Sequence, residues 1–276
     1  MSSTATVSRR EAGQPGRRYG FRGVARMEWI KLRSMRSTWW SLGVAAVAMI
    51  GLSILVLSIA SSHWATTSPA DRAAFDPTEN GYTGMAVAQL AMAVLGVLAV
   101  TGEYSSGMIR NTFAAAPRRG LVIAAKAAVV GALTLVTGEI FAFATFGIGQ
   151  RLLAAPVPHA SLGQPGVLRA VVLAGAYLAL IALIGAGLGT LARRSAAAIA
   201  VLAGVIFVLP LITLALPETT QHAVQKFLPE VIAENSLTAV KAVPYSLSAW
   251  AGLAVLAGYA AVLLGAGAWL TARRDA

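Results

Sequence analysis

Long stretches without charged residues dominate the polarity pattern of this chain. Five stretches of 23 to 34 residues contain no Asp, Glu, Lys or Arg, and a sixth stretch of 24 residues carries Glu139 alone. The six stretches are residues 37–70, 80–102, 127–150, 170–192, 195–217 and 242–272. About 20 apolar residues are enough for a helix to cross a bilayer, and such a helix satisfies its own backbone hydrogen bonds in lipid. The pattern therefore predicts an all-α integral membrane protein with six transmembrane helices.

We expect the spans near residues 39–60, 83–100, 127–148, 170–192, 196–216 and 248–270. The alternative is a soluble bundle of buried core helices. It is disfavoured by the length of the apolar runs and by a composition that is 57% hydrophobic and 12% charged. An even number of spans places both termini on the same side of the membrane.

The basic residues indicate which side this is. Seventeen of the 22 lysines and arginines fall in the N-terminal leader, in alternate connections and in the C-terminal tail, whereas five fall on the opposite side. The connection between the second and third spans is assigned four of the seventeen, namely Arg110, Arg118, Arg119 and Lys126. Because Lys and Arg are retained in the cytoplasm, we expect both termini to be cytoplasmic. The net charge of +11 then follows from membrane topology, and it favours contact with anionic membrane lipid over nucleic-acid binding.

The N-terminal region divides into two parts. Residues 1–18 are rich in Ser, Thr, Arg and Gly and are predicted to be a disordered basic leader, before a single membrane domain over residues 19–276. From Tyr19 to Thr38 the pattern predicts a basic amphipathic helix that lies at the membrane interface, although Glu28 interrupts its apolar arc. A short soluble elbow before the first span is the alternative.

Three features mark the later spans. The connection over residues 217–247 alternates apolar and acidic positions and predicts one or two short outer helices. Gly185-x-x-x-Gly189 in the fourth span allows close helix approach, either within one subunit or at a dimer face. Pro210 is expected to kink the fifth span.

The polar connection between the second and third spans is the strongest candidate site. Glu103 closes the second span, and Ser105 or Ser106 is expected to cap a short helix that Pro117 ends. This helix would present Arg110 to the cytoplasm, while Arg119 anchors at the lipid headgroups. From the residues alone, a solvated turn with interfacial positive charges explains the segment equally well.

Glu139 is the carboxylate predicted to lie within a span. We consider it either a pathway-lining or gating residue, or a structural side chain that hydrogen-bonds a neighbouring helix. Other chemistry has little support in the sequence. There is no cysteine, the three histidines lack metal-ligand spacing, and no G-x-x-x-x-G-K-[ST] phosphate loop occurs.

Two short motifs resemble the permease subunits of type-2 ATP-binding-cassette (ABC) exporters, especially those of high-GC Gram-positive bacteria. The first is the stretch from Glu28 to Trp40, and the second is Glu103-x-x-x-Gly107-x-Ile109-Arg110 with Pro117-x-Arg119 after it. Met108 stands where that family commonly has Thr. The similar layout covers nearly the whole chain.

The resemblance implies roles for both motifs. The connection between the second and third spans would be a coupling helix that presses on a separate cytoplasmic ATPase. Its matching residues are Glu103, Gly107, Arg110, Pro117 and Arg119. The interfacial helix would carry Glu28, Lys31, Arg33 and Arg36. Because this sequence has no phosphate loop, ATP and magnesium would bind the partner subunit, and we expect no cofactor in this chain.

The same resemblance implies a non-enzymatic subunit in a bacterial plasma membrane that pairs with a second permease copy or a paralogue. The direction of transport would be outward. Because the spans are rich in Ala, Leu, Val and Gly, an amphiphilic or hydrophobic substrate would fit them better than a small ion. Two alternatives stay open: a non-transporting membrane scaffold or sensor of the same fold, and a proton-coupled carrier that uses Glu139.

Overall fold

The structure is a computed structural model that describes residues 20–116, 118–153, 155–239 and 244–273. The predicted leader over residues 1–18 and Pro117 lie outside this part of the chain. Within it, all the regular structure is helical. In chain order the helices are α1 (Phe21–Ser34), α2 (Arg36–Ala46), η1 (Val47–Gly51), α3 (Leu52–His63), η2 (Trp64–Thr66), α4 (Pro69–Ala74), α5 (Pro77–Gly81), α6 (Met85–Ser105), α7 (Met108–Ala115), α8 (Arg119–Leu152), α9 (Val167–Ala192), α10 (Ser195–Ala203), η3 (Gly204–Val208), α11 (Leu209–Thr213), α12 (Glu218–Gln225), α13 (Pro229–Leu237) and α14 (Ala249–Arg273).

Six helical segments of the described chain are long and apolar enough to cross a membrane. They are Arg36–Thr66, Met85–Ser105, Arg119–Leu152, Val167–Ala192, Ser195–Thr213 and Ala249–Arg273. Each one overlaps a predicted span, so the all-α architecture with six spans is confirmed. The third span differs most, because α8 begins at Arg119 rather than near residue 127. The connection before it is therefore shorter than the sequence suggested.

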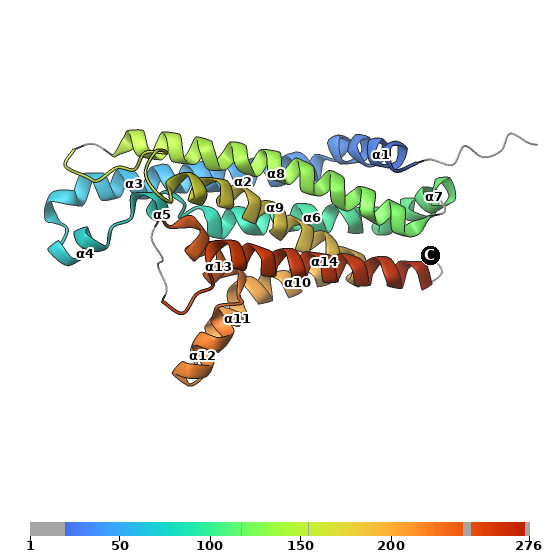
Figure 1. Cartoon of the computed structure of the whole chain (residues 1–276). Helices are drawn as coiled ribbons and strands as arrows, with labels where there is room; N and C mark the ends of the chain where they lie inside the picture. The colour runs from blue at the N-terminus through green and yellow to red at the C-terminus, as the bar shows by residue number, and fades with distance from the viewer. Residues whose placement is uncertain (1–19, 117, 154, 240–243, 274–276) are drawn as a thin grey trace, which may run out of the picture.

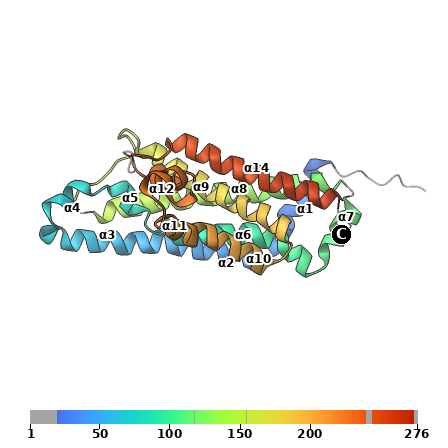
Figure 2. The same cartoon turned by 90° about the horizontal axis from the view of Figure 1, so that it is seen from below.

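Helix α9 is the central element of the bundle and packs against α6, α8 and α14 (Figures 1 and 2). Close approach depends on small residues on both sides of the α6–α9 contact. A Cβ atom added at Gly96 would lie 1.9 Å from the carbonyl oxygen of Ala182, and one at Gly185 would lie 2.2 Å from that of Ala93. The Gly185-x-x-x-Gly189 pattern thus serves packing within one chain, which was one of its two expected uses.

The fifth span is irregular near its middle. The π-helical segment η3 separates α10 from α11, and Pro210 follows in the first turn of α11. A π turn rearranges the backbone hydrogen bonds, and Pro210 has no N–H to donate, so the two features break the regular helix at the place where a kink was predicted. Beyond the break, α11 and α12 lean away from the other helices (Figure 1).

The two ends of the bundle differ in charge. One end, called here the α7 end, carries α1, α7, the α9–α10 turn and the last turn of α14 (Figure 1). Its basic residues include Arg33, Arg36, Arg110, Arg118, Arg119, Arg193, Arg194 and Arg273. The opposite end, called the α13 end, carries α4, α5, α12 and α13, and the basic residues Arg72, Arg151, Arg169 and Lys226. Helices α12 and α13 confirm that the connection between the last two spans is helical.

The α6–α9 contact generates a stability prediction. Gly96→Ala places a methyl group against backbone, which cannot rotate out of the way, and should lower the free energy of unfolding by about 1–3 kcal/mol. Gly147→Ala is the matched control, because nothing lies within 4 Å of an added Cβ at that membrane-helix position. Thermal unfolding of both variants in the same detergent measures the difference. Equal stability of the two variants would mean that the contact is looser than the structure shows.

Candidate functional site: a buried ion network behind helix α7

Helix α7 is connected to α6 by a tight turn. Gly107 adopts a left-handed conformation with φ of 70°, which a residue with a side chain rarely adopts. Ser105 and Ser106 do not cap α7 as predicted. Their hydroxyl groups instead donate hydrogen bonds to the carbonyl oxygen of Gly102, over 3.1 and 2.8 Å, and so belong to the end of α6. The start of α7 is set by glycine geometry rather than by a serine cap.

One face of α7 is buried and the other is exposed. Ile109 and Phe113 form an apolar cluster with Val24 of α1 and Val122 of α8. The opposite face presents side chains of Met108, Arg110 and Asn111 to the surroundings. Helix α7 is therefore amphipathic and is fixed to its neighbours along one side, while its other side is free for contact with a further molecule.

Behind α7 lies a group of charged side chains that we call the buried ion network, made up of Glu28, Lys31, Glu103 and Lys126. The Lys31 Nζ atom lies 2.8 Å from Glu28 Oε1 and 3.1 Å from Glu103 Oε1. The Lys126 Nζ atom lies 2.6 Å from Glu103 Oε1 and also pairs with Glu28 Oε2. Two carboxylates and two ammonium groups thus compensate one another where little water reaches them.

Thr112 connects this network to α7. Its hydroxyl group accepts a hydrogen bond from Lys31 Nζ over 2.9 Å and donates one to Glu103 Oε2 over 3.1 Å. Lys126 Nζ also donates to the carbonyl oxygen of Ala99 over 3.1 Å. The network therefore joins four elements: α1, which carries Glu28 and Lys31, α6 with Glu103, α7 with Thr112, and α8 with Lys126.

Two interpretations from the sequence need correction. Lys126 was assigned to the cytoplasmic connection among positive charges at the membrane surface, but it lies two turns inside α8 and is only 6% exposed. Glu28 was described as an interruption of an apolar arc. It lies between Val24 and Leu32 in the buried stripe of α1, because Lys126 and Lys31 neutralise it there. Sequence reasoning missed the pairing of Glu28 with Lys126 because these two residues are 98 positions apart along the chain.

The other candidate residues occupy different surroundings. Arg110 is exposed on α7, Arg33 is exposed near the end of α1, and Arg36 is exposed at the start of α2. Arg119 instead faces the bundle, where it donates a hydrogen bond to the carbonyl oxygen of Thr271 over 2.9 Å and lies 5.3 Å from the ring of Phe113. The structure thus brings Glu28, Lys31 and Glu103 together and leaves Arg110 free on the surface.

The end of α6 also contacts the turn between the fourth and fifth spans. The Arg193 guanidinium lies 5.3 Å from the centre of the Tyr104 ring, a cation–π distance. The hydroxyl oxygens of Thr101 and Ser195 are 2.8 Å apart and share a hydrogen bond. A displacement of α6 at this end is therefore transmitted to α10.

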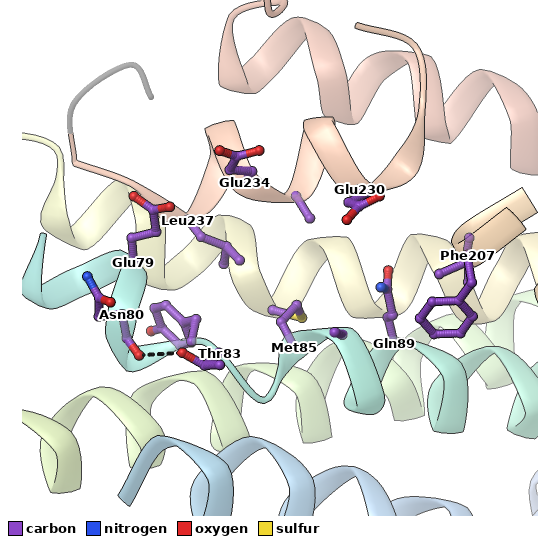
Figure 3. Close-up of a pocket in the computed structure, with 13 residues that line it drawn as sticks. Glu79, Asn80, Thr83, Met85, Gln89, Phe207, Glu230, Glu234 and Leu237 are labelled. Carbon is purple, nitrogen blue, oxygen red and sulfur yellow. Dashed lines mark hydrogen bonds between the residues drawn. The ribbon is translucent and has the colours of Figure 1, made fainter. Parts of the chain in front are cut away.

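A second candidate site, called here the outer cavity, lies near the α13 end and has a volume of about 250 Å³. It is bounded by α5, α6, η3 and α13, and Figure 3 shows Glu79 and Glu234 on one side and Gln89 with Phe207 on the other. Gln89 is buried and its Oε1 accepts a hydrogen bond from the Tyr177 hydroxyl of α9. The polar wall of this cavity was not predicted, because Glu79 of α5 is remote in sequence from Glu230 and Glu234 of α13.

The carboxylates of the outer cavity influence one another. Burial raises the pKa of Glu79, and the negative charges of Glu234 and Asp76 raise it further. Burial also raises the pKa of Glu234, helped by the charge of Glu230. The cavity wall thus holds more negative charge than its surroundings compensate, an arrangement that favours a cationic or neutral group over an anionic one.

Glu139 lies apart from both sites. It extends from α8 toward α9, where Gly175 leaves room for it, since a Cβ atom at that position would lie 2.5 Å from Glu139 Cδ. The Glu139 Oε2 atom is buried and has no hydrogen-bond partner among the described residues. The side chain does not line the outer cavity. A pathway role for Glu139 stays a prediction.

The sequence is similar to a known family of membrane proteins. The family model described as ABC-2 family transporter protein matches residues 25–211. The match includes the residues of the buried ion network, α7, the first four spans and most of the fifth. No curated protein matches the chain.

The buried ion network predicts a strong coupling between charges. Lys126→Met leaves two buried carboxylates with one ammonium partner and should lower the free energy of unfolding by about 3–5 kcal/mol. Adding Glu103→Gln restores the balance of one carboxylate to one ammonium, so the double variant should be more stable than the Lys126→Met variant. Chemical unfolding in detergent measures each form.

Arg118→Met is the control for this comparison. Arg118 is a basic residue exposed at the start of α8, and its loss should change stability by less than about 0.5 kcal/mol. If the effects of Lys126→Met and Glu103→Gln simply add, the two side chains do not form a common network.

Proposed function

The chain belongs to the ABC-2 family of transporter proteins, and we propose that it is the permease subunit of an ABC exporter driven by a separate ATPase subunit. The observation that supports this most is the fixation of α7. Its inner side is held by Thr112 and the buried ion network, while Arg110 stands on its exposed side. A short helix that is fixed to several spans and exposed at one end of the bundle suits contact with a motor protein.

The proposed mechanism begins with ATP. ATP binding closes the ATPase dimer, which moves the surface against which α7 rests. Because ATP binds the closed state more tightly, it shifts the equilibrium of the whole complex. The Thr112 hydroxyl and the contacts of Ile109 and Phe113 carry the displacement of α7 to α1, α6 and α8. These helices include the second and third spans and the helix that precedes the first.

The fourth and fifth spans follow through the turn that joins them. Arg193 rests on Tyr104, and Ser195 is bonded to Thr101, so movement of α6 reaches the start of α10. The break at η3 and Pro210 lets the inner and outer halves of the fifth span change their relative angle. The outer half then opens or closes the outer cavity, which η3 borders.

The substrate we propose is an amphiphilic or hydrophobic molecule that moves outward. The spans offer mainly aliphatic side chains, and the outer cavity adds an acidic wall near its exit. A hydrophobic body with a cationic or neutral polar group fits both surfaces. Under this proposal the transport pathway lies between two permease subunits. The second subunit is another copy of this chain or a paralogue.

We propose that the α7 end is cytoplasmic and that the protein lies in a bacterial plasma membrane with both termini inside. The excess of arginines at the α7 end supports this orientation. It also places α1 at the inner headgroup layer, where exposed Arg22, Arg26, Arg33 and Trp29 suit the interface.

Charge reversal on α7 tests the coupling. Arg110→Glu should weaken binding of the ATPase subunit by about tenfold or more, because arginines are frequent hot spots of interfaces, and ATP-driven export should fall with it. Each variant is purified from its native membrane and tested for an ATPase subunit that co-purifies with it, and export is measured in inverted vesicles. Arg194→Glu is the control, since Arg194 is an exposed arginine at the same end. Export at the normal rate by the Arg110→Glu protein would refute the assigned role of α7.

Orientation is tested separately with single cysteines. The natural chain has none, so each introduced cysteine reports one position. A membrane-impermeant maleimide should label Ser161→Cys in intact cells, because Ser161 is exposed toward the α13 end. It should label Ser106→Cys, exposed at the α7 end, only after the cells are permeabilised. The reverse labelling pattern would show that the protein has the opposite orientation in the membrane. Helix α7 would then lie outside the cell, where it could not contact a cytoplasmic ATPase.

A further inference from the structure

An apolar groove borders the fifth span beside the outer cavity, and Ile206 lines both. We call it the α14 groove. Its walls come from α9, from the fifth span and from α14, and α12 with the start of α13 covers its outer end. Its volume is about 940 Å³, near the upper limit of the range of roughly 300–1,000 Å³ found for ligand sites. Representative lining residues are Ile184, Leu188, Val205, Leu209, Phe227 and Val262.

The sequence explains why the groove exists. At one side α9 and α14 touch closely, since a Cβ atom at Gly187 would lie 2.6 Å from Leu263 Cβ. The fifth span diverges from this pair at η3 and Pro210, so a wedge-shaped space opens between them. Two hydrogen bonds hold the outer wall of the groove in place. The Tyr259 hydroxyl donates to the carbonyl oxygen of Phe227 over 3.3 Å, and Gln225 Nε2 donates to Thr213 Oγ1 over 3.1 Å.

The position of the groove limits what fills it. Its walls are three membrane-spanning segments, and none of its lining residues carries a charge. Water would find no hydrogen-bond partners on such a surface. An empty groove of this size is also unfavourable, because the side chains of its walls would lose their dispersion contacts. Hydrocarbon chains of the surrounding bilayer are the apolar material at hand.

The outer end of the groove adds a positive charge. Lys226 lies between the lining residues Val224 and Phe227 in sequence, at the end of α12, and its Nζ atom is 5.1 Å from the centre of the Phe227 ring. Within the described chain, Lys226 forms no ion pair with a carboxylate. A lysine above an apolar slot at the membrane surface complements a lipid that has a phosphate group above its acyl chains.

We propose that the α14 groove is a binding site for a phospholipid with an anionic headgroup, whose acyl chains lie between the fifth span and α14 and whose phosphate contacts Lys226. The lipid supplies the packing that the divergent fifth span lacks. The site concerns binding alone, so it holds or fails independently of the proposed transport function.

Photolabelling of the full-length protein in lipid nanodiscs tests the site. The probe is phosphatidylglycerol with a diazirine in one acyl chain, and peptide mass spectrometry locates the adducts. We expect the adducts to concentrate on the lining residues of the fifth span, α12 and α14. Val205→Trp, which fills the groove, should reduce this labelling at least about fivefold. Val136→Trp, at an exposed position of α8 outside the groove, should leave it unchanged.

The headgroup contact is tested with surface variants that leave the packing intact. Lys226→Gln should lower the preference of the groove for phosphatidylglycerol over phosphatidylcholine by about fivefold, which corresponds to about 1 kcal/mol per lysine near an anionic surface. Arg151→Gln, at another basic residue of the α13 end, should leave the preference unchanged.

Three results would overturn the proposal. The first is labelling spread evenly over the lipid-facing helices. The second is an unchanged headgroup preference in the Lys226→Gln protein. The third is cross-linking of the lining residues to a second copy of the chain, which would show that protein rather than lipid fills the groove.

Discussion

The neutralisation of two buried carboxylates by a buried lysine, Lys126, and a partly buried one, Lys31, is the constraint on which the arrangement of the α7 end depends. Glu28, Lys31, Glu103 and Lys126 come from three helices, and Thr112 adds a fourth. Removing such charges from water costs several kcal/mol per ion, so their gain in stability over apolar side chains is small. Their effect is on geometry, because any displacement of one helix leaves a charge without its partner. The network therefore makes α1, α6, α7 and α8 move together.

Rigidity in the rest of the bundle comes from small residues and not from charge. Gly96 and Gly185 bring α6 and α9 into backbone contact, and Gly187 does the same for α9 and α14. The fifth span is the exception, since η3 and Pro210 interrupt it and its outer half leans away from α9. The first span also contains a π segment, η1, but the fifth combines its π segment with a proline, which favours bending there. This physical contrast is the reason why the proposed mechanism assigns the change of angle to the fifth span.

The sequence predicted well what depends on local composition and less well what depends on pairing. Five charge-free stretches and a sixth that carries Glu139 alone located the spans, and Pro210 located the break in the fifth, because both properties are carried by neighbouring residues. Glu28 and Lys126 were misinterpreted, since a buried charge is distinguished from a surface charge only by a partner that is remote in sequence. The capping role of Ser105 and Ser106 was wrong for a similar reason, as the left-handed Gly107 had already set the turn. The outer cavity draws its acidic wall from α5 and α13, which no sequence pattern brings together.

The two cavities beside the fifth span share a wall, and this makes them interdependent. Ile206 of η3 lines both the outer cavity and the α14 groove. A shift of η3 toward α14 would narrow the groove and widen the outer cavity, whereas a shift toward α6 would do the reverse. A lipid held in the groove resists the first movement, so a fifth span that opens the outer cavity must displace or compress acyl chains. The energy for that step has to arrive from the α7 end, through Thr101 and Ser195 and then along α10 to η3. The bilayer thereby becomes a mechanical part of the proposed cycle, because it determines how much work is needed to move the span on which both cavities depend.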